Sequence, residues 1–217
     1  MKSDSLKKFY DENALKWLKI KKSRSIDRVG KLLIQTLPIK REAALDLGCG
    51  TGVYGEFLGG RFKKVWGIDI SLEMLKLGEG YRRSMDFIQA DALLLPFKNS
   101  SVDIIISSGL SEHLKKVEGL FSEVFRILKP EGLFSLSVLN KSSIWNRYGS
   151  WNYPSGLYYH SFHEINRAAQ ENGLKNKKLN YLLWAGPFSS HLPSCLDRLD
   201  FYLPSFFCHR FVALYSK

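Results

Sequence analysis

Short apolar segments alternate with amphipathic segments along most of the chain. Each apolar segment is four to seven residues long, the length of a typical buried strand. Strands that alternate with helices in this way form βαβ units, so the pattern predicts an α/β protein with a mostly parallel sheet. The strands are expected at residues 43–47, 64–68, 86–89, 102–107, 133–139, 179–183 and 211–215.

The intervening helices carry their own start and stop signals. Ser71 is placed to cap a helix, because its hydroxyl can accept an unpaired backbone N–H of the first turn. Residues 161–164 read Ser-Phe-His-Glu, the form of a capping box, so a helix is expected from there to about 172–173. Apolar residues recur at helical spacing over 120–128, and the Lys-Pro-Glu-Gly turn that follows is expected to end that helix. One more helix is expected after the first strand, with Gly52 to Leu58 as its start.

Length and composition indicate one globular domain with some additions. The chain has 217 residues, of which 45% are hydrophobic and 24% charged, which is ordinary for a globular protein. No apolar run approaches the roughly 18 to 20 residues that span a bilayer, and the first residues lack the apolar core of a signal peptide. We therefore expect a cytoplasmic protein. The three cysteines have no paired spacing, which favours reduced thiols over disulfides.

Positive charge is concentrated at the N-terminus. Residues 1–41 hold twelve Lys and Arg against four acidic residues, which accounts for +8 of the net charge of +11. A basic segment of this kind attracts the phosphates of nucleic acid or an anionic membrane face, and it is also typical of a solvated helix face. This segment could therefore bind nucleic acid or the surface of a membrane. The oligomeric state does not follow from the sequence.

A glycine-rich loop follows the first expected strand, at residues 46–52 (Asp-Leu-Gly-Cys-Gly-Thr-Gly). Glycines let the backbone pass close to a ligand, and the next helix offers free N–H groups. The glycines at 50, 52 and 55 fit G-x-G-x-x-G, and Asp69 follows Gly50 by nineteen residues, as a dinucleotide site requires. The loop alone therefore does not separate NAD from S-adenosylmethionine. A phosphate-binding P-loop is excluded, because no Gly-Lys-Ser/Thr follows.

Four motifs in order carry a family resemblance. Residues 44–52, 67–71, 89–97 and 126–132 resemble the successive motifs of class I S-adenosylmethionine-dependent methyltransferases, most of all the group of ubiquinone and menaquinone biosynthesis methyltransferases. The resemblance implies a Rossmann-like, doubly wound, seven-stranded sheet with helices on both faces and an antiparallel last strand. It also implies S-adenosylmethionine as the cofactor, a methyltransferase domain at 43–217 and a basic helical lead or lid at 1–42.

The resemblance assigns a set of cofactor-binding residues. Asp69 is expected to accept from the ribose hydroxyls, and Asp91 from the adenine amino group, with Ile70 and Ala92 on the faces of the base. The glycines approach the methionine moiety, and Asp46 holds the loop or meets the ammonium through water. Tyr10 is the candidate lid residue on the N-terminal helix. The remaining candidates are Gly48, Cys49, Gly50, Thr51, Gly52, Ser107 and Ser108.

Methyl transfer from a sulfonium requires a base only if the acceptor must lose a proton. The candidates for that base are Glu112, His113 and His160. No metal is expected, because His160-x-x-His163 lacks a third ligand at suitable spacing. Of the 29 aromatic residues, 16 lie from Trp145 onward, which predicts an aromatic-rich cap over a pocket, contributed by about 141–160 and 184–206.

These observations favour an enzyme that methylates a small acceptor of apolar character. The first alternative is an RNA methyltransferase acting on tRNA, which the basic N-terminus favours, and residues 157–162 resemble a segment of wobble-uridine tRNA methyltransferases. The second is a non-catalytic module that keeps the cofactor fold for regulation of a partner. A dehydrogenase is the remaining alternative.

Overall fold

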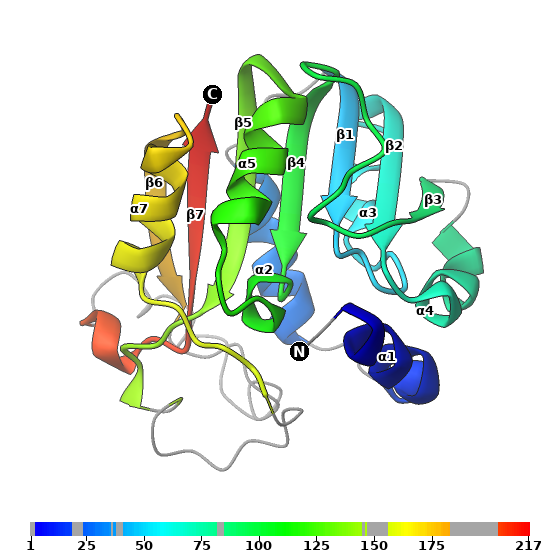
Figure 1. Cartoon of the computed structure of the whole chain (residues 1–217), viewed down its shortest axis with the longest axis horizontal. Coiled ribbons are helices and arrows are strands. Elements are labelled where there is room, and N and C mark those ends of the chain that lie inside the picture. The colour runs from blue at the N-terminus through cyan, green and yellow to red at the C-terminus, as the bar shows by residue number, and fades with distance from the viewer. Residues whose placement is uncertain are drawn as a thin grey trace.

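The computed structural model of the chain describes residues 3–18, 24–35, 37, 41–81, 85–144, 146, 156–182 and 204–217. Seven strands form one sheet, and helices cover both of its faces (Figure 1). The strands are β1 (Arg41–Leu47), β2 (Phe62–Asp69), β3 (Asp86–Gln89), β4 (Val102–Ser108), β5 (Leu128–Leu139), β6 (Lys175–Leu182) and β7 (Arg210–Ser216). The helices are α1 (Ser3–Leu18), α2 (Arg24–Ile34), α3 (Gly55–Leu58), α4 (Leu72–Leu77), α5 (Glu118–Ile127) and α7 (Phe162–Glu171), with short 3-10 turns η1 (Gly78–Tyr81), η2 (Ser111–His113) and η5 (Ser205–Phe207).

The order of strands in the sheet is β3-β2-β1-β4-β5-β7-β6. Strands β1 to β5 pair in parallel, whereas β7 runs antiparallel to both of its neighbours. This confirms the predicted fold, with its mostly parallel sheet and antiparallel last strand. The chain reverses its direction of winding at β1, which lies between β2 and β4, and ligands of such sheets bind where the strands end at this reversal. We call the side where β1 to β5 end the carboxyl edge and the opposite side the amino edge.

Most elements lie within two residues of the bounds that the sequence predicts, and three differ by more. Strand β6 starts at Lys175, four residues before the predicted start at 179. The helix expected from Gly52 is a single turn from Gly55, because Gly52 has a φ of +80°, which is incompatible with a right-handed helix. The fifth strand starts at Leu128 and includes the expected turn at 129–132, where the pairing register shifts and Glu131 adopts a φ of +60°. The two predicted caps are confirmed: Ser71 Oγ accepts from Met74 N, and the capping box at Ser161 is complete.

A separate hydrophobic core lies on each face of the sheet. On one face α5 and α7 pack on β4, β5 and β7, with the Phe121 ring edge-on to the rings of Phe134 and Tyr215. On the other face Val29 and Leu33 of α2 are buried against the end of the sheet formed by β6 and β7. Helix α2 lies within the basic N-terminal lead, so part of that lead packs into the core through the apolar side of the helix.

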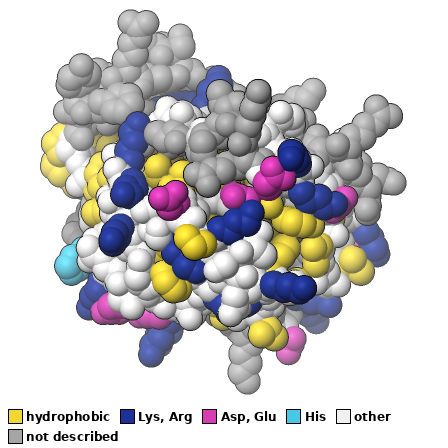
Figure 2. Space-filling model, turned by 90° about the horizontal axis from the view of Figure 1, so that it is seen from above, with side chains coloured by type: hydrophobic (Ala, Val, Ile, Leu, Met, Phe, Trp, Pro, Cys, Tyr) yellow, Lys and Arg dark blue, Asp and Glu magenta, His cyan; other side chains and the backbone are white. Residues whose placement is uncertain are grey.

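Basic side chains occupy much of the amino edge. Lys63 pairs with Glu42 at 2.8 Å, Lys129 pairs with Asp103 at 2.8 Å, and Lys64 contacts Asp86. Figure 2, which views the molecule from this edge, shows the visible Lys and Arg side chains spread among other side chains. Within the part of the chain that the structure describes, no helix has both the length and the apolar character needed to cross a membrane.

Candidate functional site

The glycine loop follows β1 at the carboxyl edge and takes a path that only glycine follows without strain. Gly48, Gly50 and Gly52 have φ values of +75°, +54° and +80°. A Cβ on Gly52 would lie 2.7 Å from the Phe87 ring. The loop is also fixed to β2, since the backbone N–H groups of Gly48 and Cys49 donate to the carbonyl of Ile68 at 2.8 Å each. The loop backbone is therefore held in place, with Gly48 and Gly50 half-buried and Gly52 buried.

Asp69 ends β2 and binds the glycine loop. Its Oδ2 accepts from Gly50 N at 2.8 Å, and its Oδ1 accepts from Ser71 N at 2.9 Å. Burial raises the pKa of Asp69, and the bonds from these backbone N–H groups oppose that rise. An ionised carboxylate oxygen can accept more than one hydrogen bond, so both oxygens keep capacity for a ligand. The structure thus brings Asp69 and Gly50 together, as a shared cofactor site requires.

Asp46, near the end of β1, is a buried acid that receives no hydrogen bond from the part of the chain that the structure describes. Only 1% of the residue is exposed, and neither carboxylate oxygen has a hydrogen-bond partner among the described residues. Burial raises its pKa to about 8, and the nearby charge of Asp69 adds to the rise. A buried polar group without a partner costs free energy, which a bound cation would recover. The loop therefore starts at a buried acid that a positively charged ligand would favour in its ionised form.

The predicted adenine-binding residues follow β2 and β3, which are neighbours in the sheet. Asp91 Oδ1 accepts from Leu93 N at 2.9 Å and so shapes the turn after β3. Ala92 is 9% exposed and packs in the core with Ile68, whereas Ile70, which follows Asp69 in the chain, is half-buried. These three predicted residues share the carboxyl edge with the glycine loop, although the two apolar side chains differ in how much surface they offer.

The remaining predicted loop and rim residues are buried or hydrogen-bonded within the protein. Cys49 and Thr51 are both buried, and burial raises the pKa of the Cys49 thiol. Ser107 Oγ donates to the carbonyl of Leu47 at 2.7 Å, which ties β4 to the end of β1. Ser108 Oγ lies 3.3 Å from the hydroxyl of Tyr54. The side chains of both serines are thus engaged with the protein.

Helix α1 crosses the carboxyl edge and brings Tyr10 to His113. The Tyr10 hydroxyl lies 2.7 Å from His113 Nε2, and the two rings meet edge to face at 5.3 Å. Burial raises the pKa of Tyr10, and the charges of Asp69 and Glu112 act in the same direction. Burial lowers the pKa of His113 from 6.5, which keeps the imidazole neutral near pH 7. The predicted lid residue therefore lies near Asp69 and in contact with one candidate base.

The other two candidate bases hold the segment that carries His113. Glu112 is 1% exposed, and its carboxylate pairs with Arg210 at 3.1 Å and accepts from Leu139 N at 3.0 Å. His160 Nε2 lies 3.1 Å from the carbonyl of Ser111 and 3.0 Å from that of Leu114, so this nitrogen is the protonated donor. These contacts fix η2 in place under the rim.

Two residues of this region were not among the predicted site residues. Arg210 carries the charge that matches Glu112, and Asp11 of α1 contacts Ser71 at the start of α4. The partners are 98 and 60 residues apart in the chain, so no local pattern announces either contact. The predicted aromatic cap at 141–160 and 184–206 lies largely outside the described residues.

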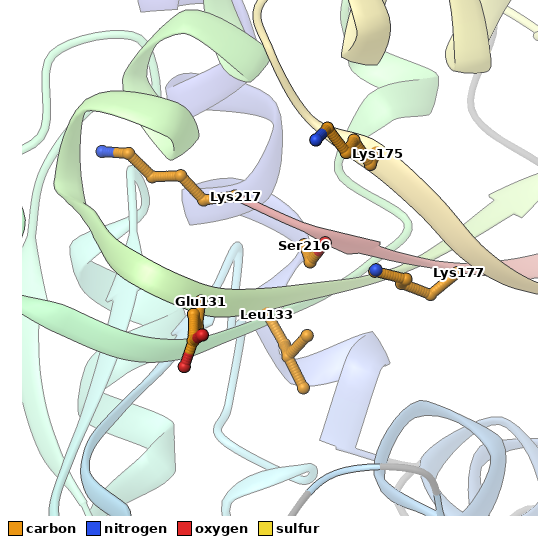
Figure 3. Close-up of a pocket in the computed structure, with 6 residues that line it drawn as sticks. All are labelled: Glu131, Leu133, Lys175, Lys177, Ser216 and Lys217. Carbon is orange, nitrogen blue, oxygen red and sulfur yellow. The ribbon is translucent and has the colours of Figure 1, made fainter.

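A hollow of about 400 Å³ lies at the amino edge, away from the glycine loop (Figure 3). It is formed where β5, β6 and β7 meet at that edge. Lys217 Nζ is held there by the carbonyls of Phe125 and Leu128, at 2.7 and 2.8 Å. Lysines on β6, an edge strand, also protect that strand from pairing with other chains. The hollow is lined by Glu131, Leu133, Lys175, Lys177, Ser216 and Lys217.

Known proteins match both the sequence and the fold. Residues 45–136 match the family described as methyltransferase domain. A malonyl-[acyl-carrier protein] O-methyltransferase of Hamiltonella defensa is 25% identical over 175 residues, which cover 79% of this chain and 62% of that protein. A demethylmenaquinone methyltransferase of Renibacterium salmoninarum is 37% identical over 92 residues, covering 42% and 38%. The chain spans about half the length of the curated relatives it matches.

A solved structure resembles nearly the whole chain. It is one chain of the complex between the Haloferax volcanii Trm112 methyltransferase activator and a candidate methyltransferase. The two folds superimpose with a TM-score of 0.70 over 95% of this chain and 96% of that one, at 21% sequence identity. The match confirms the fold over 95% of this chain, compared with 79% for the sequence relative of Hamiltonella defensa.

Proposed function

We propose, from its membership of the class I S-adenosylmethionine-dependent methyltransferases, that the chain binds S-adenosylmethionine and transfers its methyl group to a small, apolar acceptor. The observation that carries the proposal is the buried carboxylate of Asp46, which has no hydrogen-bond partner among the described residues and lies at the start of the glycine loop. S-adenosylmethionine carries a sulfonium and an ammonium, and both positive groups complement an acidic site.

The short α3 and the buried acid Asp46 also disfavour binding of a dinucleotide cofactor at the glycine loop. A diphosphate is stabilised by the N-terminus of a long helix after the glycine loop. Here α3 has only four residues, which offers a diphosphate little support. Asp46 is mostly neutral near pH 7, and a cation beside it favours the ionised form, whereas an anion does not. The G-x-G-x-x-G spacing alone does not outweigh these two features, so we favour the cationic cofactor over NAD.

Each part of the cofactor has a candidate partner at the carboxyl edge. We assign the ribose hydroxyls to Asp69, because each of its oxygens can accept one more hydrogen bond beside those from Gly50 and Ser71. We assign the adenine to Asp91 and Ile70, and the methionine moiety to the loop backbone and Asp46. The three acids lie at or just after the carboxyl ends of β1, β2 and β3, which are adjacent in the sheet, so one extended ligand can contact all of them.

S-adenosylmethionine supplies a methyl group that is already activated on sulfur, so the protein needs to hold the acceptor in line and exclude water. Helix α1 lies across the edge and contributes Tyr10, which would cover the site. His113 is our candidate for the base when the acceptor must lose a proton, because it is neutral and sits at the rim. Glu112 and His160 would position it.

The surface around the site supports an apolar acceptor. Among the described residues, the large hydrophobic side chains that are exposed all belong to segments at the carboxyl edge. They lie on α1, at the start of α4, on the turn after β3 and on η5. Apolar surface gathered at one edge is typical of a binding region, whereas single apolar side chains scattered over a surface are not. These residues are Leu15, Leu72, Leu93, Leu94 and Phe206.

Methylation of RNA is a second candidate, because residues 1–41 carry a net charge of +8. RNA held by these residues would dissociate steeply as salt rises, since each neutralised phosphate releases counterions. Binding of tRNA measured at about 50 and 200 mM salt tests this candidate. Absent binding, or binding that does not change with salt, would exclude it.

The proposed function is tested in two steps. Isothermal titration with S-adenosylmethionine should give saturable binding, which Asp69→Ala abolishes, and NADH should give no fluorescence change. Incubation with methyl-labelled cofactor and a fractionated cell extract should then place the label in the lipid or small-molecule fraction. No binding of S-adenosylmethionine would refute the proposal. Binding without a labelled product in any fraction would instead identify a non-catalytic module.

A further inference from the structure

A chain of hydrogen bonds runs from α1 to the glycine loop. Asp11 Oδ1 accepts from Ser71 Oγ at 2.5 Å and from Glu73 N at 3.3 Å. Ser71 in turn donates its backbone N–H to Asp69 Oδ1 at 2.9 Å, and Asp69 Oδ2 accepts from Gly50 N at 2.8 Å. Consecutive hydrogen bonds thus connect three segments of the polypeptide. Asp69, the acid between Ser71 and Gly50 in this row, is the proposed ribose ligand.

The middle of this connection is inaccessible to water. Ser71 is fully buried, and its hydroxyl accepts from Met74 N at 3.2 Å while it donates to Asp11. The hydroxyl has only one proton, so Asp11 provides the acceptor that Ser71 needs. If Asp11 moves away, a buried donor loses its partner, which is costly. Docking of α1 therefore determines whether the Ser71 hydroxyl has an acceptor for its hydrogen bond.

Tyr10, the preceding residue, ties α1 to the other side of the loop. Its hydroxyl contacts His113 in η2, which follows β4. Asp11 contacts Ser71, which follows β2. Strands β2 and β4 flank β1 in the sheet, so two consecutive residues of α1 are attached on either side of the glycine loop. Figure 1 shows α1 beside the carboxyl ends of these strands.

We propose that Asp11 is a positioning residue that couples the docking of α1 to the glycine loop, through Ser71 and Asp69. The inference rests on the proposed function, because the coupling acts on the cofactor site. Cofactor binding at Asp69 and Gly50 stabilises the docked helix, and the docked helix strengthens cofactor binding by the same factor, as linkage requires. Asp11 and Asp69 are also two acids on either side of Ser71, so a cationic cofactor lessens their mutual repulsion and favours docking.

The test compares Asp11→Ala with Glu12→Ala in the full chain. Glu12 is the next residue of α1, its side chain is 60% exposed, and it lies 3.9 Å from Lys8 on the surface. Asp11→Ala should weaken binding of S-adenosylmethionine in isothermal titration at least about tenfold, the effect of losing one buried hydrogen bond. Glu12→Ala should leave binding unchanged. Asp11→Asn keeps an oxygen acceptor but not the charge, so its affinity should fall between the two.

Trypsin provides a readout of docking itself, because Lys7, Lys8 and Lys16 lie on α1. S-adenosylmethionine should slow cleavage of α1 in the native chain and in Glu12→Ala, and should not protect Asp11→Ala. Equal affinity of native chain and Asp11→Ala, or equal protection of both, would overturn the coupling while leaving the proposed function intact. If Asp11→Ala does not fold, Asp11→Asn carries the same comparisons.

Amide hydrogen exchange separates the two proposals. If the native chain binds no S-adenosylmethionine, the proposed function fails. The connection is then judged by exchange at the amide of Gly50, which donates to Asp69. Faster exchange in Asp11→Ala than in Glu12→Ala supports the connection without any ligand, and an equal rate in the two variants overturns it.

Discussion

Arg210 Nη1 lies 3.1 Å from Glu112 Oε1, in a buried ion pair that joins the start of β7 to η2 at the rim of the site. The Arg210 side chain is 14% exposed and that of Glu112 only 2%. The same carboxylate oxygen accepts from Leu139 N, so three parts of the chain meet at one acid. The pair therefore fixes the segment that presents His113 to the site.

Removal of one member of this pair should destabilise the fold more than it affects binding directly. Arg210→Met leaves the buried carboxylate of Glu112 uncompensated, which costs about 3–5 kcal/mol in comparable cases. Urea unfolding would measure the loss. Lys141→Met is the matched control, because Lys141 and Glu164 pair at 2.6 Å with 55% and 36% of their side chains exposed. That surface pair should contribute at most about 1 kcal/mol. Equal losses in the two variants would contradict the role given to the buried pair.

The sequence predicts the sheet well because its signals are local. Strand and cap positions depend on apolar periodicity and on single residues such as Ser71 and Ser161, and the structure agrees with them. The glycine loop and Asp69 are recognisable for the same reason. Contacts between distant segments have no such signal: nothing near Arg210 or Asp11 in the chain indicates Glu112 or Ser71. The shortness of α3 could not be predicted, because the positive φ of Gly52 is set by the loop and not by helix propensity.

Gly52→Ala should damage both the fold and cofactor binding. The residue has a φ of +80°, and the new Cβ would lie 2.7 Å from the Phe87 ring. A left-handed conformation costs a residue with a side chain about 1–2 kcal/mol, and the clash adds to this. Gly60→Ala isolates the conformational cost, since Gly60 has a φ of +76° and a Cβ there would meet no other described part of the chain within 4 Å. Thermal unfolding should show a larger loss of stability for Gly52→Ala than for Gly60→Ala. In titration with S-adenosylmethionine, only Gly52→Ala should lose binding.

Asp46 should make the stability of the cofactor-free chain depend on pH. Burial raises its pKa to about 8 from an ordinary 3.8, so between these values the folded chain binds more protons than the unfolded chain. The stability that the fold has while Asp46 is protonated in both states is complete below about pH 4, and it is lost as pH rises through about 8. Asp46→Asn stays neutral, so its free energy of unfolding should increase relative to the native chain between about pH 4 and 8 and stay level above that. Exposed Asp4→Asn should track the native chain over this range, and a constant difference for Asp46→Asn would disprove the assignment.

The same carboxyl should release a proton when S-adenosylmethionine binds. Near pH 7 a pKa of about 8 leaves Asp46 mostly protonated in the free chain, and a cationic ligand beside it favours the ionised form. Binding should therefore strengthen as pH rises from about 6 to 8, up to about tenfold for each pH unit when one proton is released. Titration near pH 7 in buffers with different ionisation enthalpies counts that proton directly. Asp46→Asn should release none, and a native chain that also releases none would show that Asp46 does not face the positive groups of the cofactor.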